Sequence, residues 1–393
     1  MNGGNPDRVD LVFWALLAAA NAVALIILWQ TGWWLYRLDG SPWAHDYIAQ
    51  WASGFRVLSG NAALVYDWAG HSAYQARLIG APKPVELYVF YPPHFLFTTP
   101  AFAWLGHVQA SLAFLLVTAS AYAASLYLWV RNWEKAALVA VAGGGAFYSI
   151  WWTQNGFLTA ALFTAGLAFL NRRPVVAGIF FGLLTIKPQL GLLIPVALLV
   201  SGNWRAIVSA TVTFLLLAIA AEAFLGEGIW ETFFTSISEA SGFLQSGNLW
   251  FKQQSLFALL FPIYGPGVAW VFHSILALTV AAIVAWMWCN RGSHWNKSSA
   301  LMSASLLVTP YLYPYDAVLL TAAAVMLLYE GHGPTLSRWE RVLVFLCCLA
   351  PMATRFIYSA AVPLAALILL YIAVHRAKVG ERIGPRDAAT SIT

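Results

Sequence analysis

The stretch TQNGFLTAALFTAGLAFLNRRPVVAGIFFGLLTIKPQLGLLIPVALL, residues 153–199, contains three apolar runs in succession. Charged side chains interrupt it at two points only, the pair Arg172 and Arg173 and the single Lys187. A run of about 17–25 apolar residues crosses a bilayer. The shorter runs here lie next to Pro and Gly, which is typical of broken helices packed inside a membrane protein. The stretch therefore predicts closely connected membrane helices.

The composition of the whole chain excludes a water-soluble protein. Of 393 residues, 61% are hydrophobic and 9% are charged, whereas soluble domains carry about 25% charged residues. Breaks in hydropathy predict an all-α polytopic membrane protein with one transmembrane domain, residues 1–375, of about twelve helices. The expected spans lie near residues 11–29, 109–130, 135–150, 157–170, 174–186, 189–200, 206–224, 267–289, 299–311, 317–329, 341–354 and 357–374.

Two features beside the first apolar run of the chain, residues 11–29, argue against a cleaved signal peptide. The segment before it carries one Arg against two Asp, and the bulky sequence WQTGWWLYRL (29–38) follows it in place of a small-residue cleavage site. We therefore expect this run to remain as the first span.

Lysine and arginine predict the orientation of the spans. Most of them fall in one set of short loops, such as RNWEK (131–135) and NRRP (171–174), and in the C-terminal tail. Positive charge marks the cytoplasmic side, so both termini are expected there, with residues 376–393 as a disordered tail. Two long loops, 30–108 and 226–266, are expected on the outer face. Because prolines weaken 91–107 as a span, we expect it to form an amphipathic helix on the outer membrane surface.

Several short motifs occur in order along the chain: HDY (45–47), GNAALVYD (60–67), YPP (91–93), QNG (154–156), KPQ (187–189) and TPYLYPYD (309–316). Together, over about residues 11–330, they resemble the polytopic glycosyltransferases of the GT-C superfamily. More narrowly, they resemble glycosyltransferase family 87, which includes a mycobacterial mannosyltransferase that elaborates phosphatidylinositol mannosides. The resemblance implies a GT-C-type bundle with juxtamembrane helices in the first outer loop. It also implies that a sugar is transferred, with inversion, from a polyprenyl-phosphate donor on the outer face.

The resemblance further implies that the catalytic base is an acidic residue of the first outer loop, which maps to Asp46. From the residues alone, Asp46 has a second interpretation as the N-cap of a helix that begins near Tyr47. The chain departs from the family pattern in one place. Mycobacterial-type relatives carry a His near the outer end of a late span, where this chain has Tyr311, Tyr313 and Asp316. Any role that this His has in the relatives therefore cannot be assigned to a residue of this chain.

An inverting transfer needs a base for the acceptor hydroxyl, groups that stabilise the departing phosphate, and a groove for the polyprenyl chain. Lys187 lies between two apolar runs, where a cation is costly and so is a functional candidate. The alternative is a Lys whose ammonium reaches back to the interface. Arg355, at an outer span end, has the same two interpretations. The candidate phosphate-binding residues are Lys187, Gln189, Lys252 and Arg355.

A second group of polar residues is expected to contact the sugar or the acceptor. Each also has a structural interpretation: a polar turn for the QNG residues, a helix start for Gln254, and a helix cap or an ion-pair partner of Lys187 or Arg355 for Asp316. The many Trp and Tyr residues fit stacking on sugar rings, but most are expected at the membrane interface. The candidates are His45, Tyr91, His94, Gln154, Asn155, Gln254, Tyr313 and Asp316.

No cofactor is expected. The chain lacks D-x-D and H-E-x-x-H motifs and has no acidic cluster around Asp46, so we expect no metal. If a divalent ion were bound, its ligands would be Asp46 together with Asp316 or Glu86. The three cysteines are interpreted as packing residues. The net charge of +5 is spread over span ends, which fits contact with anionic membrane lipids and not with nucleic acid.

The sequence therefore predicts a hexosyltransferase of the bacterial inner membrane. Its donor is expected to be a polyprenyl-phosphate-linked sugar, mannose or another hexose or pentose, and its acceptor a lipid or a glycan. Two other classes stay open. An O-antigen-type ligase or polymerase would use outer Arg and His residues, and the second long loop contains neither. A flippase for lipid-linked sugars would carry charges within its spans and show two similar halves.

Overall fold

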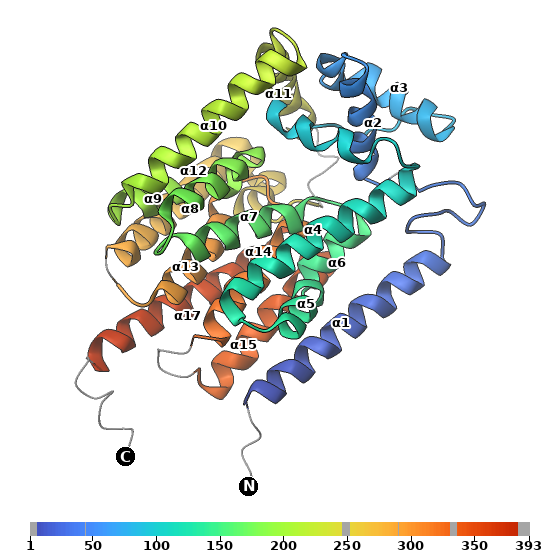
Figure 1. Ribbon diagram of the computed structural model, residues 1–393. Helices are drawn as coiled ribbons and strands as arrows, with labels where there is room; N and C mark the ends of the chain where they lie inside the picture. The colour runs from blue at the N-terminus through green and yellow to red at the C-terminus, as the bar shows by residue number, and fades with distance from the viewer. Residues whose placement is uncertain (1–5, 44, 246–251, 290, 331–335, 384–393) are drawn as a thin grey trace.

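The computed structural model of the chain describes residues 6–43, 45–245, 252–289, 291–330 and 336–383. These residues form helices joined by turns, with isolated backbone bridges and no β-strand among them. The α-helices (Figure 1) are α1 Pro6–Gln30, α2 Tyr47–Leu58, α3 Trp68–Ile79, α4 His107–Val130, α5 Trp133–Ala142, α6 Gly144–Trp151, α7 Gly156–Phe169, α8 Pro174–Leu183, α9 Ile194–Val200, α10 Trp204–Leu225, α11 Ile229–Gln245, α12 Leu256–Trp288, α13 His294–Val308, α14 Val318–Leu328, α15 Arg338–Leu349, α16 Thr354–Ile357 and α17 Ala361–Ile383.

Short 3₁₀ turns connect several of these helices. They are η1 Ala62–Val65, η2 Pro93–Thr98, η3 Pro100–Phe102, η4 Leu184–Ile186, η5 Pro188–Gly191, η7 Pro314–Ala317, η8 Ala350–Ala353 and η9 Tyr358–Ala360. Five of them begin with a proline or have one at the second position. Proline lacks the N–H that an α-helix interior needs, but it is tolerated in the first turn.

The helices account for the predicted spans in different ways. Five segments of the described chain are long and apolar enough to cross a membrane: Val9–Gln30, His107–Val130, Trp204–Leu225, Leu256–Trp288 and Tyr358–Val379. The other predicted spans coincide with shorter helices, several of them joined end to end, as α5 is to α6. The protein is thus an all-helical membrane protein, and the number of twelve crossings stays a prediction.

The expected break in the spans 174–186 and 189–200 falls at Lys187. Helix α8 and η4 end there, and η5 and α9 begin after it. Lys187 leaves helical geometry (φ −139°, ψ 71°) because a residue before proline is pushed out of the α region. Residues 174–186 span about 20 Å at a helical rise, less than the roughly 30 Å of the hydrocarbon core. The segment is therefore too short to cross a membrane alone, and the side chain of Lys187 at its end is buried inside the protein.

The centre of the bundle is α14, whose eleven residues are all buried and which contacts α6, α7, α13, α15 and α17. The turn η7 that precedes it packs tightly on the start of α7. A Cβ added to Gly156 would lie 2.2 Å from the carbonyl oxygen of Tyr315. The glycine of the QNG motif is thus required by backbone contact, and this contact fixes the segments 153–156 and 313–316 against each other.

The first outer loop is ordered at one end of the bundle. In Figure 1, α2, α3 and α11 lie at the end opposite the start of α1 and the end of α17. Residues Val65, Tyr66, Val89 and Leu96 of this loop form a small core with α10 and α11. The loop residues are therefore held against the membrane helices as a packed layer, which we call the outer layer after the side of the membrane that the sequence predicts for it.

Three expectations about these segments are wrong. Residues 91–107 form the two turns η2 and η3 rather than one amphipathic helix, because prolines occupy the start of each turn. The span expected at 267–289 begins too late, because helix α12 starts at Leu256 and runs through a kink at Gly265, whose φ is 78°. This start agrees with the second interpretation of Gln254 as a residue at a helix start. Segment 226–266 also contains α11, and its place on the outer face stays a prediction. Helix α17 continues to Ile383, so residues 376–383 are helical; residues 384–393 lie outside the described residues.

Candidate active site

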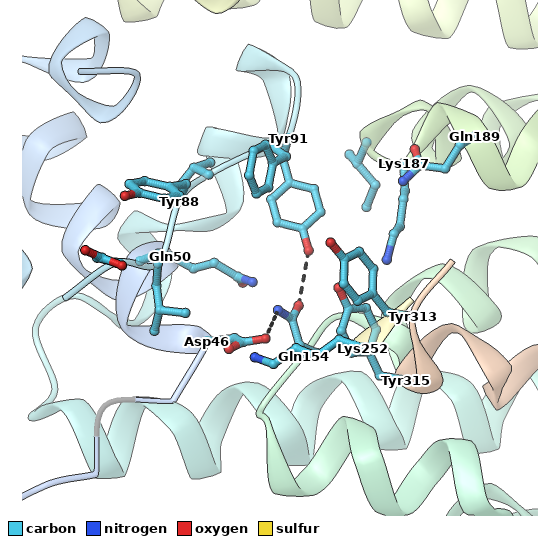
Figure 2. A pocket seen from close by; sticks show the side chains of 16 residues that line it. Asp46, Gln50, Tyr88, Tyr91, Gln154, Lys187, Gln189, Lys252, Tyr313 and Tyr315 are labelled. Atoms are coloured by element: carbon cyan, nitrogen blue, oxygen red, sulfur yellow. Dashed lines mark hydrogen bonds between the residues drawn. The ribbon is translucent and has the colours of Figure 1, made fainter. Parts of the chain in front are cut away.

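A pocket opens where the outer layer meets the membrane helices (Figure 2). Segment 86–91 and the start of α2 form one wall, and residues beside the QNG turn, the Lys187 break and η7 form the other. Seven of the predicted site residues line it: Asp46, Tyr91, Gln154, Lys187, Gln189, Lys252 and Tyr313. Residues from six separate segments of the sequence therefore converge on one pocket.

Asp46 occupies the N-cap position of α2 but does not cap it. Its backbone is already helical (φ −55°, ψ −24°), and its side chain makes no cap hydrogen bond, whereas capping residues adopt extended geometry so that the side chain can turn back. Its carboxylate Oδ2 instead accepts a hydrogen bond of 3.0 Å from Nε2 of Gln154. The half-buried carboxylate is thus directed into the pocket.

A chain of two hydrogen bonds fixes that carboxylate. The hydroxyl of Tyr91 donates to Oε1 of Gln154 at 3.1 Å, while Nε2 of the same amide donates to Asp46. Because the Tyr91 hydroxyl donates to the amide oxygen of Gln154, the NH₂ group of Gln154 is the end of the amide that faces the Asp46 carboxylate. Burial, with the charges of Asp316 and Asp46 nearby, raises the pKa of the Tyr91 hydroxyl well above its usual value, so Tyr91 stays a donor.

The turn that carries Gln154 is strained. Thr153 has a positive φ of 48°. This conformation is unfavourable for a residue other than glycine, and such strained residues cluster at functional sites. The turn is held by Ser149, whose hydroxyl donates to the Tyr315 carbonyl at 3.2 Å. The packing of η7 on α7 therefore holds Gln154 in place.

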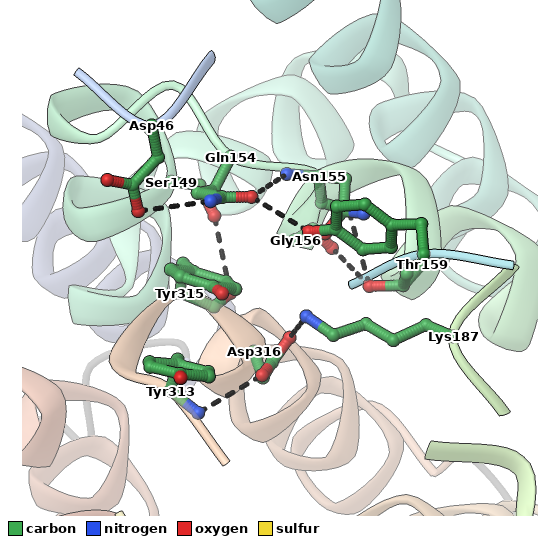
Figure 3. Close-up of polar contacts among 11 residues, drawn as sticks. Asp46, Ser149, Gln154, Asn155, Gly156, Thr159, Lys187, Tyr313, Tyr315 and Asp316 are labelled. Carbon is green, nitrogen blue, oxygen red and sulfur yellow. Dashed lines mark hydrogen bonds and ion pairs between the residues drawn. The ribbon is translucent and has the colours of Figure 1, made fainter. Parts of the chain in front are cut away.

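Lys187 meets Asp316 beneath the pocket (Figure 3). Its ammonium donates to Oδ1 at 2.5 Å, and both side chains are almost fully buried. Oδ2 of Asp316 accepts the backbone N–H of Tyr313 at 3.1 Å, so the carboxylate serves as ion-pair partner and cap at once. An ammonium has three donors. The pair with Asp316 uses one, and Lys187 still lines the pocket.

Two further polar side chains of the pocket wall come from the candidate phosphate-binding set. Gln189 follows Lys187 across Pro188 and is half-buried. Lys252 places its ammonium 5.1 Å from the centre of the Trp152 ring, at a distance suited to a cation–π contact. Lys187 itself lies 4.5 Å from the Tyr315 ring. Two ammonium groups with aromatic neighbours thus reach the same pocket.

The remaining candidates do not line the pocket. His45 is buried against His107, with ring centres 4.9 Å apart, and burial lowers its pKa well below the usual range. His94 contacts the hydroxyl of Thr185 at 3.2 Å, and burial lowers its pKa to about 4. Burial therefore favours the neutral form of both rings, and neither side chain lines the pocket.

The other three candidates outside the lining differ from one another. Asn155 is buried behind Gln154 at the start of α7. Gln254 is fully buried, and its backbone N–H donates to the Leu312 carbonyl at 2.7 Å. Arg355 belongs to α16, but its side chain lies outside the described residues.

Sequence reasoning missed Gln50, Tyr88 and Tyr315, which also line the pocket. Gln50 is 3% exposed, and its Nε2 has no hydrogen-bond partner among the described residues. Figure 2 shows its amide extending toward Gln154 and Asp46. Because residues i and i+4 share one helix face, the spacing from Asp46 to Gln50 was the signal that could have found it.

A separate apolar groove is lined by residues that flank Lys187 in the sequence. It runs between α8, α9 and α10 and is lined by residues on both sides of Lys187, including Leu184, Thr185 and Pro188. Leu192 in the groove and Leu215 and Leu216 of α10 are exposed to the surroundings of the bundle. Lys187 itself lines the pocket and is not part of the groove lining.

Within the described part of the chain, no three His, Cys, Asp or Glu side chains group together as metal ligands. Glu86, which the sequence analysis considered with Asp46, lines the same pocket, while Asp46 accepts a hydrogen bond from Gln154 and Asp316 is paired with Lys187.

Comparison with known sequences identifies the class of protein. The sequence pattern of glycosyltransferase family 87 matches residues 88–310, a segment that includes Tyr91, Gln154, Lys187, Gln189 and Lys252 but not Asp46 or Asp316. No curated protein and no solved structure gives a significant match. Because the matched segment covers more than half of the 393 residues, the chain belongs to glycosyltransferase family 87.

Proposed function

We propose that this glycosyltransferase moves a hexose or pentose, mannose first among them, from a polyprenyl-phosphate donor to a hydroxyl of a lipid or glycan. The reaction proceeds with inversion on the outer face of a bacterial inner membrane, and both termini lie in the cytoplasm. Asp46 is the general base. The observation that carries the proposal is the pairing, in one pocket, of a fixed carboxylate on one wall with two ammonium groups on another.

The proposed chemistry is a single displacement at the anomeric carbon. One oxygen of Asp46 is held by Gln154, and the other takes the proton from the acceptor hydroxyl. The acceptor oxygen forms a bond to the anomeric carbon as the bond to the phosphate oxygen breaks. The electron pair leaves with the polyprenyl phosphate. Lys187, Gln189 and Lys252 stabilise the negative charge that develops there.

The groove between α8, α9 and α10 supports a lipid-linked donor. Its apolar lining starts beside Lys187, so the phosphate of the donor meets the ammonium where the lipid chain leaves the groove. A monophosphate donor brings less charge than a diphosphate, and the lysines and amides of the pocket supply the groups that hold it. We therefore propose that the enzyme works without a metal ion.

The pocket also offers contacts for the sugar. The Nε2 group of Gln50, which has no hydrogen-bond partner among the described residues, and the side chains of Tyr313 and Tyr88 line it. Aromatic rings and amide groups are the usual contacts of sugar rings and hydroxyls in such sites, where a few polar groups fix orientation. We assign Gln50 and Tyr313 to the sugar, and Gln154 to the orientation of Asp46.

The test is sugar transfer by the purified protein. Polyprenyl-phosphate mannose carrying a radiolabel is mixed with the protein and a membrane lipid extract, and labelled product is counted with and without EDTA. Asp46→Asn is expected to lower kcat about 10³-fold with unchanged thermal stability. The matched control is Asp67→Asn, because Asp67 caps α3 in the same loop and is not part of the pocket. This control is expected to keep its turnover.

Two outcomes would contradict parts of the proposal. Normal turnover by Asp46→Asn would exclude it as the base. The second outcome is labelled sugar that crosses the bilayer but stays attached to polyprenyl phosphate. If this is found for mannose and for the other polyprenyl-linked sugars, the protein moves the donor across the membrane and does not transfer the sugar.

A further inference from the structure

A second cleft lies at the other end of the bundle, away from the proposed catalytic pocket. It has a volume of about 530 Å³ and is formed by the last turn of α4, the connection between α7 and α8, and the first turn of α13. This end also carries the start of α1 and the end of α17 (Figure 1). Small-molecule sites have volumes of about 300–1,000 Å³, so the cleft is large enough for a ligand.

Three arginines surround this cleft. Arg131 follows α4, while Arg172 and Arg173 precede α8, and all three line the cleft. No ion pair of these three occurs among the described residues, in contrast to Arg341 and Arg376, which are paired with Asp10 and Glu330. Arg131 adopts a left-handed conformation with a φ of 54°. Two sequence-distant segments thus direct three uncompensated positive charges to one concave site.

The wall behind the arginines is rigid and aromatic. His294 donates from Nε2 to the Leu167 carbonyl at 2.8 Å and stacks on Trp129 at 5.4 Å. Trp129 donates to the Thr164 carbonyl at 3.1 Å and meets Trp295 edge-on at 4.8 Å. Because these bonds satisfy the ring nitrogens of His294 and Trp129 that face the helices, the wall is fixed before any ligand arrives.

The cleft is also amphipathic. Leu128, Ala168 and Phe169 contribute apolar surface next to the arginines. A ligand with a phosphate at one end and acyl chains at the other matches this division. Arginine binds phosphate oxygens in a bidentate manner, and basic pockets between membrane helices on the cytoplasmic side bind anionic lipid headgroups.

We infer that this cleft binds the phosphate headgroup of one anionic phospholipid, with the acyl chains along the apolar side of the cleft. Arginines that only set the orientation of the spans would be spread over the loops. These three converge on one concavity. This inference is independent of the transfer reaction proposed above, because it involves none of the pocket residues.

The test measures lipid binding to the whole protein in a neutral detergent. Phosphatidylglycerol is titrated and the bound lipids are counted by native mass spectrometry, with phosphatidylcholine as the neutral lipid and inorganic pyrophosphate as the soluble anion. The variants are Arg131→Gln and the double Arg172→Gln/Arg173→Gln. The control is Arg205→Gln, because Arg205 lies in the first turn of the neighbouring helix α10 and does not line the cleft.

The expected result is one tightly held phosphatidylglycerol in the wild type and in Arg205→Gln, with binding weakened about tenfold in Arg131→Gln and more in the double variant. Arg172→Lys/Arg173→Lys is expected to recover part of the loss, which excludes misfolding as the cause. Equal weakening in Arg205→Gln would overturn the inference, because the lipid would then respond to overall charge. Binding of pyrophosphate as tight as that of the lipid would also overturn it, because the acyl chains would then contribute nothing.

Discussion

Asp46 lines the pocket and Asp316 is buried beneath it, and the two carboxylates are held in opposite ways. Asp46 is half-buried, and a neutral amide contacts one of its oxygens at 3.0 Å. Asp316 is buried and binds the ammonium of Lys187 at 2.5 Å and the backbone of Tyr313 at 3.1 Å. One carboxylate keeps an oxygen toward the pocket, and both oxygens of the other are occupied.

This difference separates a reactive group from a supporting one. A general base needs a proton acceptor that is oriented but not neutralised, which a single amide donor provides. A buried carboxylate without a partner is costly, so Asp316 needs its cation. The comparison predicts that changes at Asp316 act first on stability, and that changes around Asp46 act first on turnover.

The largest effect is expected from Asp316→Asn. This substitution leaves the ammonium of Lys187 buried and without its carboxylate, which costs about 3–5 kcal/mol of folding free energy. The measurement is the unfolding midpoint in mixed micelles of increasing denaturing detergent.

The double variant Lys187→Met/Asp316→Leu sharpens this prediction. It is expected to recover most of the lost stability, because apolar residues can replace a buried ion pair at little cost. Its turnover should stay low, since Lys187 is also the proposed phosphate contact. If the wild type and Asp316→Asn were equally stable, the ion pair of Lys187 and Asp316 would contribute nothing to folding. The distinction between Asp316 as a supporting carboxylate and Asp46 as a reactive one would then fail.

The next effect concerns Gln154. Gln154→Leu removes the donor to Asp46, a charge-assisted hydrogen bond of about 1.5–3 kcal/mol, and is expected to lower kcat about 10- to 100-fold with a smaller change in KM. Gln154→Glu places a second carboxylate against Asp46. Like charges favour the protonated form, so the acidic limb of the kcat profile should move to higher pH. An unmoved limb would show that Gln154 does not act through Asp46.

The fold was predictable from the sequence where local patterns decide it. The apolar runs placed the helices, and Pro188 marked the break at Lys187. Segment 91–107 and the start of α12 were not predictable in this way. The prolines Pro92, Pro93 and Pro100 break segment 91–107 into turns, and helix α12 begins before Gly265 and runs through the kink there. A hydropathy pattern registers neither the prolines nor the kink.

The site was predictable for residues that are chemically unusual for their surroundings. Lys187 and Asp316 are charges in apolar sequence, and their pairing was one of the options that the sequence left open. Gln154 was found as a polar turn, but its bond to Asp46 joins residues 108 positions apart. Gln50 was missed because a Gln on a helix is not chemically unusual, and its spacing of four residues from Asp46 was the only hint in the sequence. The structure adds that its Nε2 has no hydrogen-bond partner among the described residues.

The smallest effect is expected from Tyr91→Phe, which removes the hydroxyl that orients the Gln154 amide. A neutral hydrogen bond contributes about 1 kcal/mol, so kcat should fall about fivefold. Because burial and the nearby Asp316 and Asp46 raise the pKa of this hydroxyl well above its usual value, Tyr91 should cause no alkaline loss of wild-type activity up to pH 10. The control is Tyr66→Phe, which removes a hydroxyl bound to the Tyr91 carbonyl at 2.9 Å and leaves the amide oriented. An alkaline loss in the wild type that disappears in Tyr91→Phe would show that Tyr91 ionises, and the amide would then be oriented in some other way.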